Sequence, residues 1–462
     1  MGVRRRWTRQ GRQGQVLAAM ATVPLLLGVA PAAAAHASGT GPALLRPAAA
    51  SPTVTGPVTG GQGAIVLQGT SFDLGSVGYR QSEFFLSGNA TSYAPAAPLG
   101  SDGRWQVTPA STAPYTTRIV VYRPANPARF NGTVVVEWLN VSAGLDVSPE
   151  WVYAHNELIR DGFAWVGVSA QAVGVAADKA ADPVRYAALS HPGDSYSYDI
   201  FSQAGQAVRD SAAKIFGGLR PRTVLAEGES QSAFRLTTYI DAIQPLVHTY
   251  NGFLIHSRGG GSAALSQAPQ ADIPTPPVVS FRPDLSAPVL AVETETDLML
   301  LGYLSAQQAD FPRFRLWEVA GTAHADDYIA NLGAGDNGSG AAGRQELDSM
   351  LNPPAGTPAF TCATPINTGE GHYVVDAAEH ALNRWVTAGT PPATAARLQV
   401  ATSGFGTTTP FSAPKLAALY PTHARFVARW AASTVADVAA GFIRPADAAE
   451  LVAAAIKSGV GG

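Results

Sequence analysis

Three residues whose types suit nucleophilic catalysis occur in a fixed order along the chain, each at or just after the end of an apolar run. Ser230 lies in GESQS (228–232), Asp297 ends APVLAVETETD, and His324 ends FRLWEVAGTAH. A serine can attack a carbonyl carbon when a histidine takes its proton and a carboxylate orients that histidine. The interval between Asp297 and His324 leaves room for one helix and one strand. The order therefore predicts a Ser–acid–His triad.

Each of these residues also has a structural interpretation. Ser230 could be an ordinary loop serine, His324 a hydrogen-bonded polar residue, and Asp297 the N-cap of a following helix. Glu295 could serve as the acid instead, although the strand-end position favours Asp297. The triad is preferred because all three residues fall in the required order at consecutive strand ends.

The surroundings of Ser230 predict a tight turn from strand to helix. Gly228 is the small residue that such a turn needs before the serine, and Ser232 replaces the glycine expected after it. The backbone N–H of Gln231 is one expected donor to the oxyanion. The second is the N–H of Val141 or of Asn140, unless the Asn140 side chain serves to fix its loop. Glu229, inside the turn, is expected to make a supporting hydrogen bond.

Other polar residues are candidates for a substrate pocket. Asp194 and Tyr198 lie in HPGDSYSYD, and His372 lies in GEGHYV. They could line the site, or they could hold a turn or cap a helix. The chain has no H-E-x-x-H, no phosphate-binding P-loop and no G-x-G-x-x-G after a strand, so the sequence supports no metal and no cofactor.

The elements that must position these residues form a regular alternation. Apolar, β-branched runs predict strands, and most are continuous, as in strands buried on both faces of a parallel sheet. The runs lie near 117–124, 132–140, 163–171, 222–230, 250–257, 287–297 and 314–324. Helical patterns separate several of them, near 149–162, 198–216, 231–246 and 298–311. The fold class is therefore α/β, with short antiparallel strands expected over 64–108.

The rest of the chain divides into additions to this domain, which we place at 61–462. Two insertions, about 172–198 and 325–371, are expected to be loops or a small cap. A helix over 372–388 should end at Gly389 before Pro391 and Pro392. The last segment, about 410–462, predicts a helical extension of two helices.

The N-terminus predicts export. Five arginines in the first twelve residues precede an apolar run (16–30) and small residues (31–38), which is the layout of a secretory signal peptide over 1–35. The apolar run is short for a membrane span, so none is expected after cleavage. Residues 36–60 read as a flexible leader. We expect a secreted protein, by a route that the sequence leaves open.

Composition excludes some classes of protein. Of 462 residues 14% are charged, the formal net charge is −3, and no long basic run exists, which argues against a nucleic-acid partner. The single cysteine, Cys362, rules out an intramolecular disulfide. It is either a buried, inert residue, which is favoured, or a free thiol.

Several segments resemble the α/β-hydrolase-domain family of exported bacterial proteins. They include NGTVVVEWLNVSAGLDVSPEW, HPGDSYSYDI, LAEGESQSAFRL, VETETD, WEVAGTAH and TGEGHYVVDAAEHALNRWV, and the resemblance runs from about Leu67 to Ser458. It implies an α/β-hydrolase fold with Ser230, His324 and either Asp297 or Glu295 as the catalytic set. It implies no particular substrate.

The expected function is a secreted serine hydrolase that cleaves carboxylic esters, small or polymeric, through an acyl-enzyme. Two alternatives stay open. An acyltransferase would pass the same acyl group to an alcohol rather than to water, and a non-catalytic binding protein could keep the fold. The sequence leaves the oligomeric state undetermined.

Overall fold

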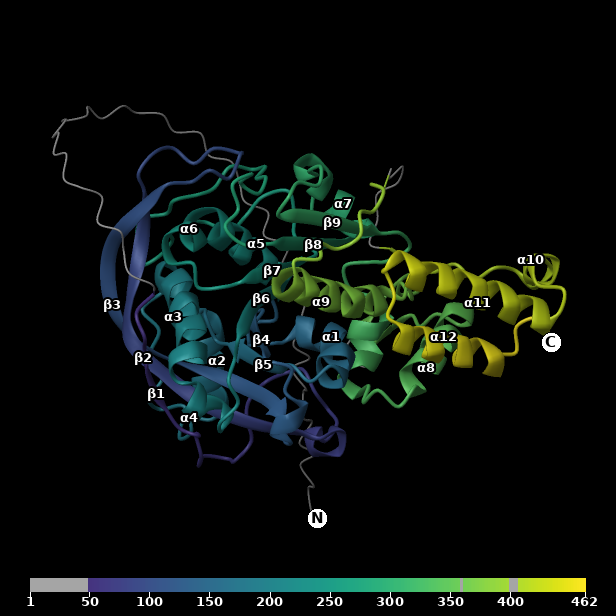
Figure 1. Cartoon of the computed structure of the whole chain (residues 1–462), viewed down its shortest axis with the longest axis horizontal. Helices are drawn as coiled ribbons and strands as arrows, with labels where there is room; N and C mark the ends of the chain where they lie inside the picture. Colours follow the sequence, from purple (N-terminus) through teal and green to yellow (C-terminus); the bar gives the residue numbers. More distant parts are fainter. Residues whose placement is uncertain (1–48, 358–359, 399–405) are drawn as a thin grey trace, which may run out of the picture. The chain divides into compact units, whose positions relative to one another are not determined.

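The computed structural model describes residues 49–357, 360–398 and 406–462 (Figure 1). A nine-stranded sheet has the order β1-β2-β3-β5-β4-β6-β7-β8-β9. Its first pairings, β1 with β2, β2 with β3 and β3 with β5, are antiparallel, and all others are parallel. The strands are β1 (Thr53–Thr55), β2 (Tyr79–Pro95), β3 (Val107–Pro124), β4 (Thr133–Trp138), β5 (Ala164–Val168), β6 (Thr223–Glu229), β7 (Gly252–His256), β8 (Val289–Thr294) and β9 (Phe314–Val319). The expected α/β class, with a mostly parallel sheet and antiparallel N-terminal strands, is confirmed.

Helices cover both faces of the parallel strands. On one face α1 (Pro149–Arg160) packs beside α9 (Gly371–Ala388), over a core that includes Leu225, Leu254 and Leu290. On the other face α3 (Ser197–Asp210) and α5 (Gln231–Thr238) bury a second core with Val136, Ala226 and others. Further helices in this part of the chain are α2 (Ala172–Ala181), α4 (Ala212–Phe216), α6 (Gln244–Val247), α7 (Glu295–Leu300) and α8 (Ala341–Leu351). Every residue of β4, β6, β7 and β8 is buried, which explains their continuous apolar runs.

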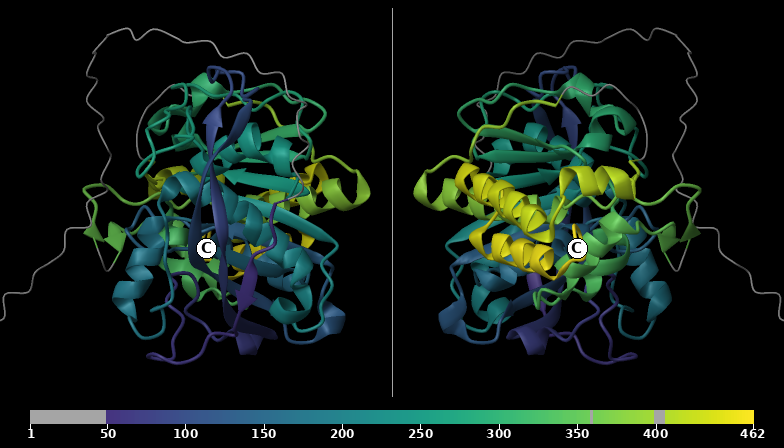
Figure 2. Two further views of the ribbon diagram at one scale, coloured as in Figure 1. Left: turned by 90° about the vertical axis from the view of Figure 1, so that its left-hand side faces the viewer. Right: turned by 90° about the vertical axis from the view of Figure 1, so that its right-hand side faces the viewer.

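The N-terminal strands differ from the prediction. β2 and β3 form one hairpin of 17 and 18 residues, drawn along the left edge of Figure 1 and facing the viewer in the left view of Figure 2. The two runs expected as separate strands, near 104–109 and 117–124, are parts of β3 because it pairs with β2 along almost its whole length. The run 64–69 contains only one isolated bridge, between Gln68 and Val147.

The predicted flexible leader is too long. Residues 1–48, including the predicted signal peptide, lie outside the described residues. β1, however, falls within the predicted leader and pairs with β2, with the Val54 side chain buried. The folded domain therefore begins before residue 61. The edge strand β1 was not predicted because it has only three residues and lies among small and turn-forming residues.

The two insertions and the C-terminal segment contain more helix than expected. α2 and α8 lie within the insertions, with a two-stranded ladder of β10 (Gly356–Thr357) and β11 (Phe360–Thr361). The C-terminal extension has three helices rather than two: α10 (Ala413–Leu419), α11 (His423–Ala440) and α12 (Pro445–Lys457). α11 packs on α12, the two long yellow helices in Figure 2, right, and α12 packs on α8. α9 ends as predicted, with Gly389 in the left-handed conformation at φ 70°. None of the helices described is both long and apolar enough to cross a membrane.

A group of carboxylates lies buried between the sheet and the α1–α9 layer. Glu137 on β4 and Glu227 on β6 are register partners, Glu379 projects from α9, and all three side chains are buried. Burial and the neighbouring carboxylates raise the pKa of Glu137 and Glu227 well above the usual value, and burial raises that of Glu379 to about 7.

Candidate active site

Ser230 lies on a sharp turn between β6 and α5. Its φ is 55°, a left-handed value that a non-glycine residue seldom adopts, so the backbone here is strained. Gly228 is required for close packing: a Cβ there would lie 2.9 Å from the Cβ of Ser232. Ser232 is fully buried. Its small side chain fits where the motif usually has glycine, so the turn stays tight.

The structure brings Ser230, His324 and Asp297 together in one hydrogen-bonded chain. Ser230 Oγ lies 2.8 Å from His324 Nε2, and His324 Nδ1 lies 2.7 Å from Asp297 Oδ1. Each comes from the carboxyl-terminal side of a different parallel strand: β6, β9 and β8. The histidine thus lies between the serine and the carboxylate, as it must if it is to act as a base on a nucleophile while an acid orients it.

Asp297 is held from several sides. Its Oδ2 accepts hydrogen bonds from the backbone N–H and the hydroxyl of Thr294, at 2.7 and 2.6 Å, and from the hydroxyl of Ser257 at 2.7 Å. The side chain is fully buried, and burial alone would raise its pKa. The hydrogen bonds from His324, Thr294 and Ser257 outweigh burial and hold the pKa below its usual value. Asp297 also completes a capping box at the start of α7 as its N3 residue, whereas the N-cap position expected for it is taken by Thr294.

Glu295 holds the loop that carries His324. Its Oε2 accepts a hydrogen bond of 2.7 Å from the backbone N–H of Gly321, in the loop that carries His324. The hydroxyl of Thr296 accepts another, of 2.8 Å, from the His324 N–H. The residues around Asp297 thus fix the histidine loop, and Glu295 does not contact the imidazole as the alternative acid would.

The electrostatics of His324 favour its charged form. Burial alone would lower its pKa, but the hydrogen bond to Asp297 and the charges of Glu229 and Asp297 outweigh it and raise the pKa to about 9. Glu229 Oε1 lies 3.5 Å from His324 Nε2, so the two ring nitrogens face two different carboxylates. Burial raises the pKa of Glu229 to about 7, although the charge of His324 opposes this.

The expected oxyanion donors are distinguished by their bonding. The Asn140 N–H donates to Val147 O at 3.0 Å. It is therefore not free to bind an oxyanion, and the expectation of Asn140 as a backbone donor is wrong. Its side chain fixes the loop: Oδ1 accepts from the Ser142 N–H and Nδ2 donates to Glu229 O. The N–H groups of Val141 and Gln231 have no acceptor among the residues described, and Gln231 begins α5. They remain the predicted pair.

The three candidate pocket residues have structural roles. Asp194 is buried and pairs with Arg235 at 3.0 Å. Tyr198 is fully buried, and its hydroxyl donates to Ala264 O at 2.7 Å. His372 is buried with its ring stacked on Tyr328 at 3.7 Å between centroids. The structure thus shows that Tyr198 and His372 are packed inside the fold, and the pocket role of the three residues stays a prediction.

Two supporting residues were not anticipated. Ser257, just after β7, has φ 54° and donates to Asp297. Gln171 Oε1 accepts from the side chains of Gln231 and Trp138, and Gln171 Nε2 donates to Asp194. Asp194 therefore supports Gln231, the residue after the nucleophile, through the side chain of Gln171. Both Ser257 and Gln171 end apolar runs that the sequence already assigned to strands, and that position was the available signal.

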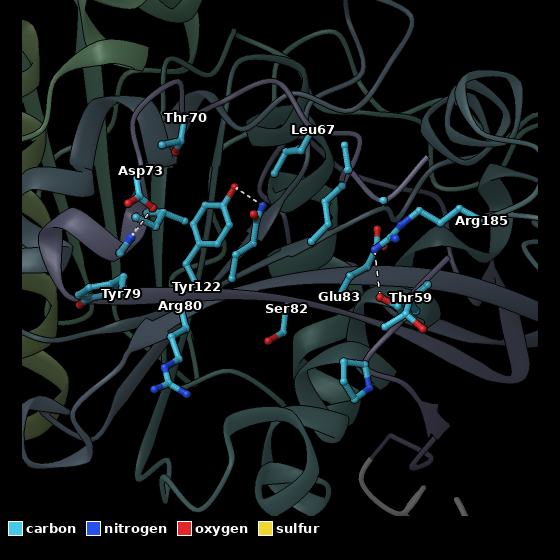
Figure 3. A pocket seen from close by; sticks show the side chains of 18 of the residues that line it. Thr59, Leu67, Thr70, Asp73, Tyr79, Arg80, Ser82, Glu83, Tyr122 and Arg185 are labelled. Carbon is cyan, nitrogen blue, oxygen red and sulfur yellow. Dashed lines mark hydrogen bonds and ion pairs between the residues drawn. The ribbon is translucent and has the colours of Figure 1, made fainter. Parts of the chain in front are cut away.

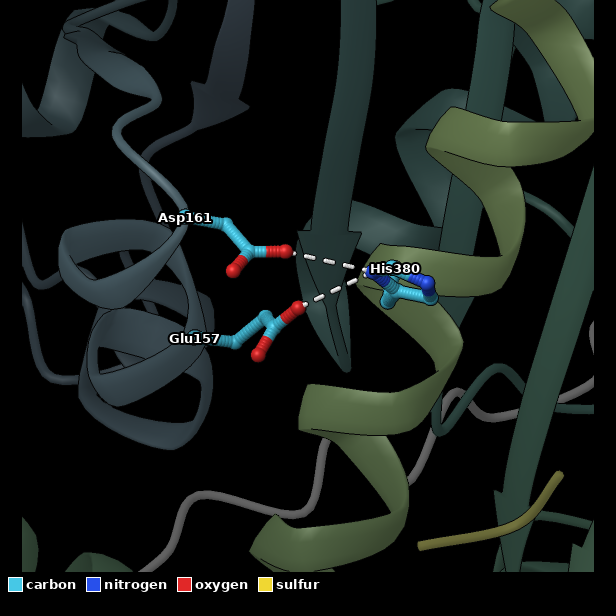
Figure 4. A group of neighbouring side chains, drawn as sticks. All are labelled: Glu157, Asp161 and His380. Atoms are coloured by element: carbon cyan, nitrogen blue, oxygen red, sulfur yellow. Dashed lines mark hydrogen bonds and ion pairs between the residues drawn. The ribbon is translucent and has the colours of Figure 1, made fainter. Parts of the chain in front are cut away.

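One group of side chains among the residues described could hold a metal ion. Glu157 of α1 and Asp161, the C-cap of α1, face His380 of α9, and His380 Nδ1 lies 3.2 Å from an oxygen of each (Figure 4). Arg444, which precedes α12, already binds the same two oxygens at 2.9 and 3.1 Å. A guanidinium thus neutralises these carboxylates, and the group is an ion-pair cluster. Cys362 is unpaired and only partly buried, unlike the inert residue favoured from sequence.

A cavity of about 1020 Å³ lies elsewhere, between residues 57–75 and β2 (Figure 3). Its lining includes Tyr79, Arg80, Tyr122 and Arg185 but none of the three triad residues. The Arg185 guanidinium is occupied by Glu83, at 2.7 Å. The cavity therefore offers no link to the chemistry at Ser230.

Comparison with known proteins identifies the fold. The family model described as "Alpha/beta hydrolase domain" matches residues 54–405 and 401–453. A lidless serine hydrolase from Xanthomonas campestris is 12% identical, with 51% of this chain and 86% of that one covered and a TM-score of 0.28. A serine hydrolase homologue from Coxiella burnetii is 10% identical, with 46% and 84% covered and a TM-score of 0.29. A Rhizomucor miehei esterase is 11% identical, with 53% and 77% covered and a TM-score of 0.28. No curated protein matches the chain.

Proposed function

The chain belongs to the alpha/beta hydrolase domain family, and on that premise we propose that it is a serine hydrolase that cleaves carboxylic esters. Family membership supports a hydrolase in general. The observation that carries the finer proposal is the chain of hydrogen bonds from Ser230 through His324 to Asp297, at 2.8 and 2.7 Å. A strained serine held against a histidine serves acyl transfer and has no use in a simple binding module.

In this proposal His324 Nε2 takes the Ser230 proton while Oγ bonds to the ester carbonyl carbon. The N–H groups of Gln231 and Val141 stabilise the oxyanion, and Asp297 stabilises the imidazolium. His324 then gives the proton to the leaving alkoxide as the ester C–O bond breaks. Water, deprotonated by the same imidazole, then bonds to the acyl carbon; the bond from that carbon to Ser230 Oγ breaks, His324 returns the proton to Oγ, and the carboxylic acid leaves. No metal or cofactor enters these steps.

The arginine-rich start and apolar run of the sequence lead us to propose that the protein is exported. A small or polymeric ester outside the cytoplasm would then be the substrate. Detection of the mature chain in culture medium, with an N-terminus near residue 36, is the expected result. Retention of the full-length chain inside the cell would contradict it.

The test is labelling with a fluorophosphonate, which reacts with activated serines. We expect a modified peptide containing Ser230 in the wild-type protein, no labelling in Ser230→Ala, and hydrolysis of nitrophenyl esters by the wild type alone. Ser232→Ala is a matched control because Ser232 is the neighbouring serine of the turn, buried, and outside the hydrogen-bonded chain.

Three outcomes separate the alternatives. Labelling with ester cleavage supports the hydrolase. Labelling with product only when an alcohol acceptor is added supports an acyltransferase. A folded wild-type protein that neither labels nor turns over any ester supports a binding protein and overturns the proposal.

A further inference from the structure

Glu229 is the residue just before the proposed nucleophile, and its carboxylate is aimed at the base rather than at solvent. Its Oε1 lies 3.5 Å from His324 Nε2, the nitrogen that also contacts Ser230 Oγ at 2.8 Å. The side chain of Glu229 is only 8% exposed. A buried carboxylate this close to an imidazole stabilises the imidazolium.

The position of the Glu229 carboxylate is fixed by Asn140. Asn140 Nδ2 lies 3.1 Å from the Glu229 carbonyl oxygen and 3.4 Å from Oε2. The amide thus binds one carboxylate oxygen and leaves the other toward His324. Because Val141 follows Asn140 directly, the same contact ties the carboxylate to the loop of the proposed second oxyanion donor.

We propose that Glu229 is a positioning residue of the proposed reaction, a second carboxylate on His324 that sets the pH range in which the base is free. This inference rests on the proposed function. Asp297 holds Nδ1 and orients the ring, whereas Glu229 faces Nε2, where the proton is gained and lost. With both carboxylates ionised, His324 keeps its proton to higher pH, and the free base appears only in alkaline solution.

The other groups around this pair come from separate elements. His256 on β7 is paired with Glu150 of α1 at 3.0 Å. The electrostatic neighbours of Glu229 and His324 are Asp297 of α7, Glu150 and Tyr153 of α1, and His256 of β7. Removal of the Glu229 charge leaves Asp297 as the carboxylate in contact with His324.

The pKa of His324, raised to about 9, agrees with this arrangement. The proposed base must be neutral to accept the Ser230 proton, so kcat/KM of the wild type should rise with pH to a midpoint near 9. An opposite charge within about 4–6 Å typically raises the pKa of a cation by about 1–3 units, so in Glu229→Gln the midpoint should fall by about 1 pH unit. The glutamine keeps the shape and can still accept from Asn140.

The experiment compares wild type, Glu229→Gln and Glu229→Asp in two measurements. The first is the pH profile of kcat/KM for a nitrophenyl ester. The second is the pKa of His324 from NMR of protein labelled with ¹³C at histidine Cε1, with the signal assigned by its loss in His324→Asn. We expect the midpoint of the pH profile and the NMR pKa of His324 to fall together in Glu229→Gln. Glu229→Asp keeps the charge, so both of its values should lie between those of Glu229→Gln and the wild type.

The outcomes distinguish this inference from the proposed function. A wild type that turns over no ester but shows a lowered NMR pKa in Glu229→Gln would reject the hydrolase and keep the contact. An active Glu229→Gln with an unchanged profile and unchanged NMR pKa would overturn the inference. If Glu229→Gln does not fold, Glu229→Asp with the same two measurements decides it, because a retracted carboxylate should also lower both values.

Discussion

Ser257 donates a hydrogen bond of 2.7 Å from its hydroxyl to Asp297 Oδ2, and it does so from a backbone with φ 54°. A left-handed conformation costs a non-glycine residue about 1–2 kcal/mol. The fold keeps this strain where β7 ends, one strand away from the carboxylate that orients His324. Local strain and placement of the acid are therefore linked in one residue.

Replacement of Ser257 should affect rate and stability in different ways. A hydrogen bond to a charged group contributes about 1.5–3 kcal/mol, so Ser257→Ala and Ser257→Gly should both lower kcat/KM by about tenfold or more. Ser257→Gly removes the backbone strain as well and should melt at a higher temperature than Ser257→Ala. Equal activity of wild type and both variants would show that the hydroxyl is not needed by Asp297.

The identity of the acid is tested by a matched pair. Asp297→Asn should lower kcat by about 10⁴, because the amide no longer favours the imidazole tautomer that can accept the serine proton. Glu295→Gln should stay close to wild type, since glutamine can still accept from the Gly321 N–H. Steady-state kinetics decide the matter, and the reverse pattern would make Glu295 the acid.

The second oxyanion donor is tested by removal of one backbone N–H. Val141→Pro has no N–H and should lower kcat by about 10²–10³, with little change in KM. Val141→Ala keeps the donor and serves as the control. Circular dichroism of both variants checks the fold. If Val141→Pro is folded and as fast as Val141→Ala, the donor lies elsewhere.

The ion-pair cluster of α1, α9 and Arg444 should make stability depend on pH (Figure 4). Hydrogen bonds that the His380 ring donates to Asp161 and Glu157 raise the pKa of His380 in the folded state. A raised folded-state pKa means that the contribution is complete below the unfolded pKa, about 6.5, and is lost as pH rises through the folded value. His380→Ala should therefore lower the free energy of unfolding more at pH 5 than at pH 9.

Urea unfolding at the two pH values measures this difference. His248→Asn is a suitable control because His248 is exposed and lies in a left-handed conformation that asparagine tolerates. An equal loss at both pH values in His380→Ala would contradict the role of the charge. A rise in melting temperature on addition of zinc, abolished in His380→Ala, would instead indicate a metal site.

The sequence predicted the parts of the site that depend on strand order. Ser230, Asp297 and His324 follow β6, β8 and β9, and largely apolar runs mark those strands, of which β6 and β8 are buried throughout and β9 over most of its length. Parallel strands bring their carboxyl ends to one edge, so the three residues could be expected to meet. Asp297 was favoured over Glu295 as a strand-end residue, but β8 ends at Thr294 and both acids lie in the first turn of α7, so only the side-chain contacts distinguish them.

The parts that depend on side-chain direction could not be predicted. The approach of Glu229 to His324 and the burial of Tyr198 and His372 result from packing between segments far apart in the chain. The hairpin of β2 and β3 was divided into short strands because proline and glycine interrupt its pattern at Gly88, Pro109 and Pro114, although pairing continues through them. β1 was missed because three residues carry little periodicity.

The buried carboxylates between the sheet and the α1–α9 layer make proton binding differ between the folded and the unfolded chain. The formal net charge of −3 counts every carboxylate as ionised, but burial and the neighbouring carboxylates raise the pKa of Glu137 and Glu227 well above the usual value. In the unfolded chain these carboxyl groups are ionised. A raised folded-state pKa means that these two groups bind protons more tightly in the folded chain than in the unfolded chain, so their contribution to stability falls as pH rises.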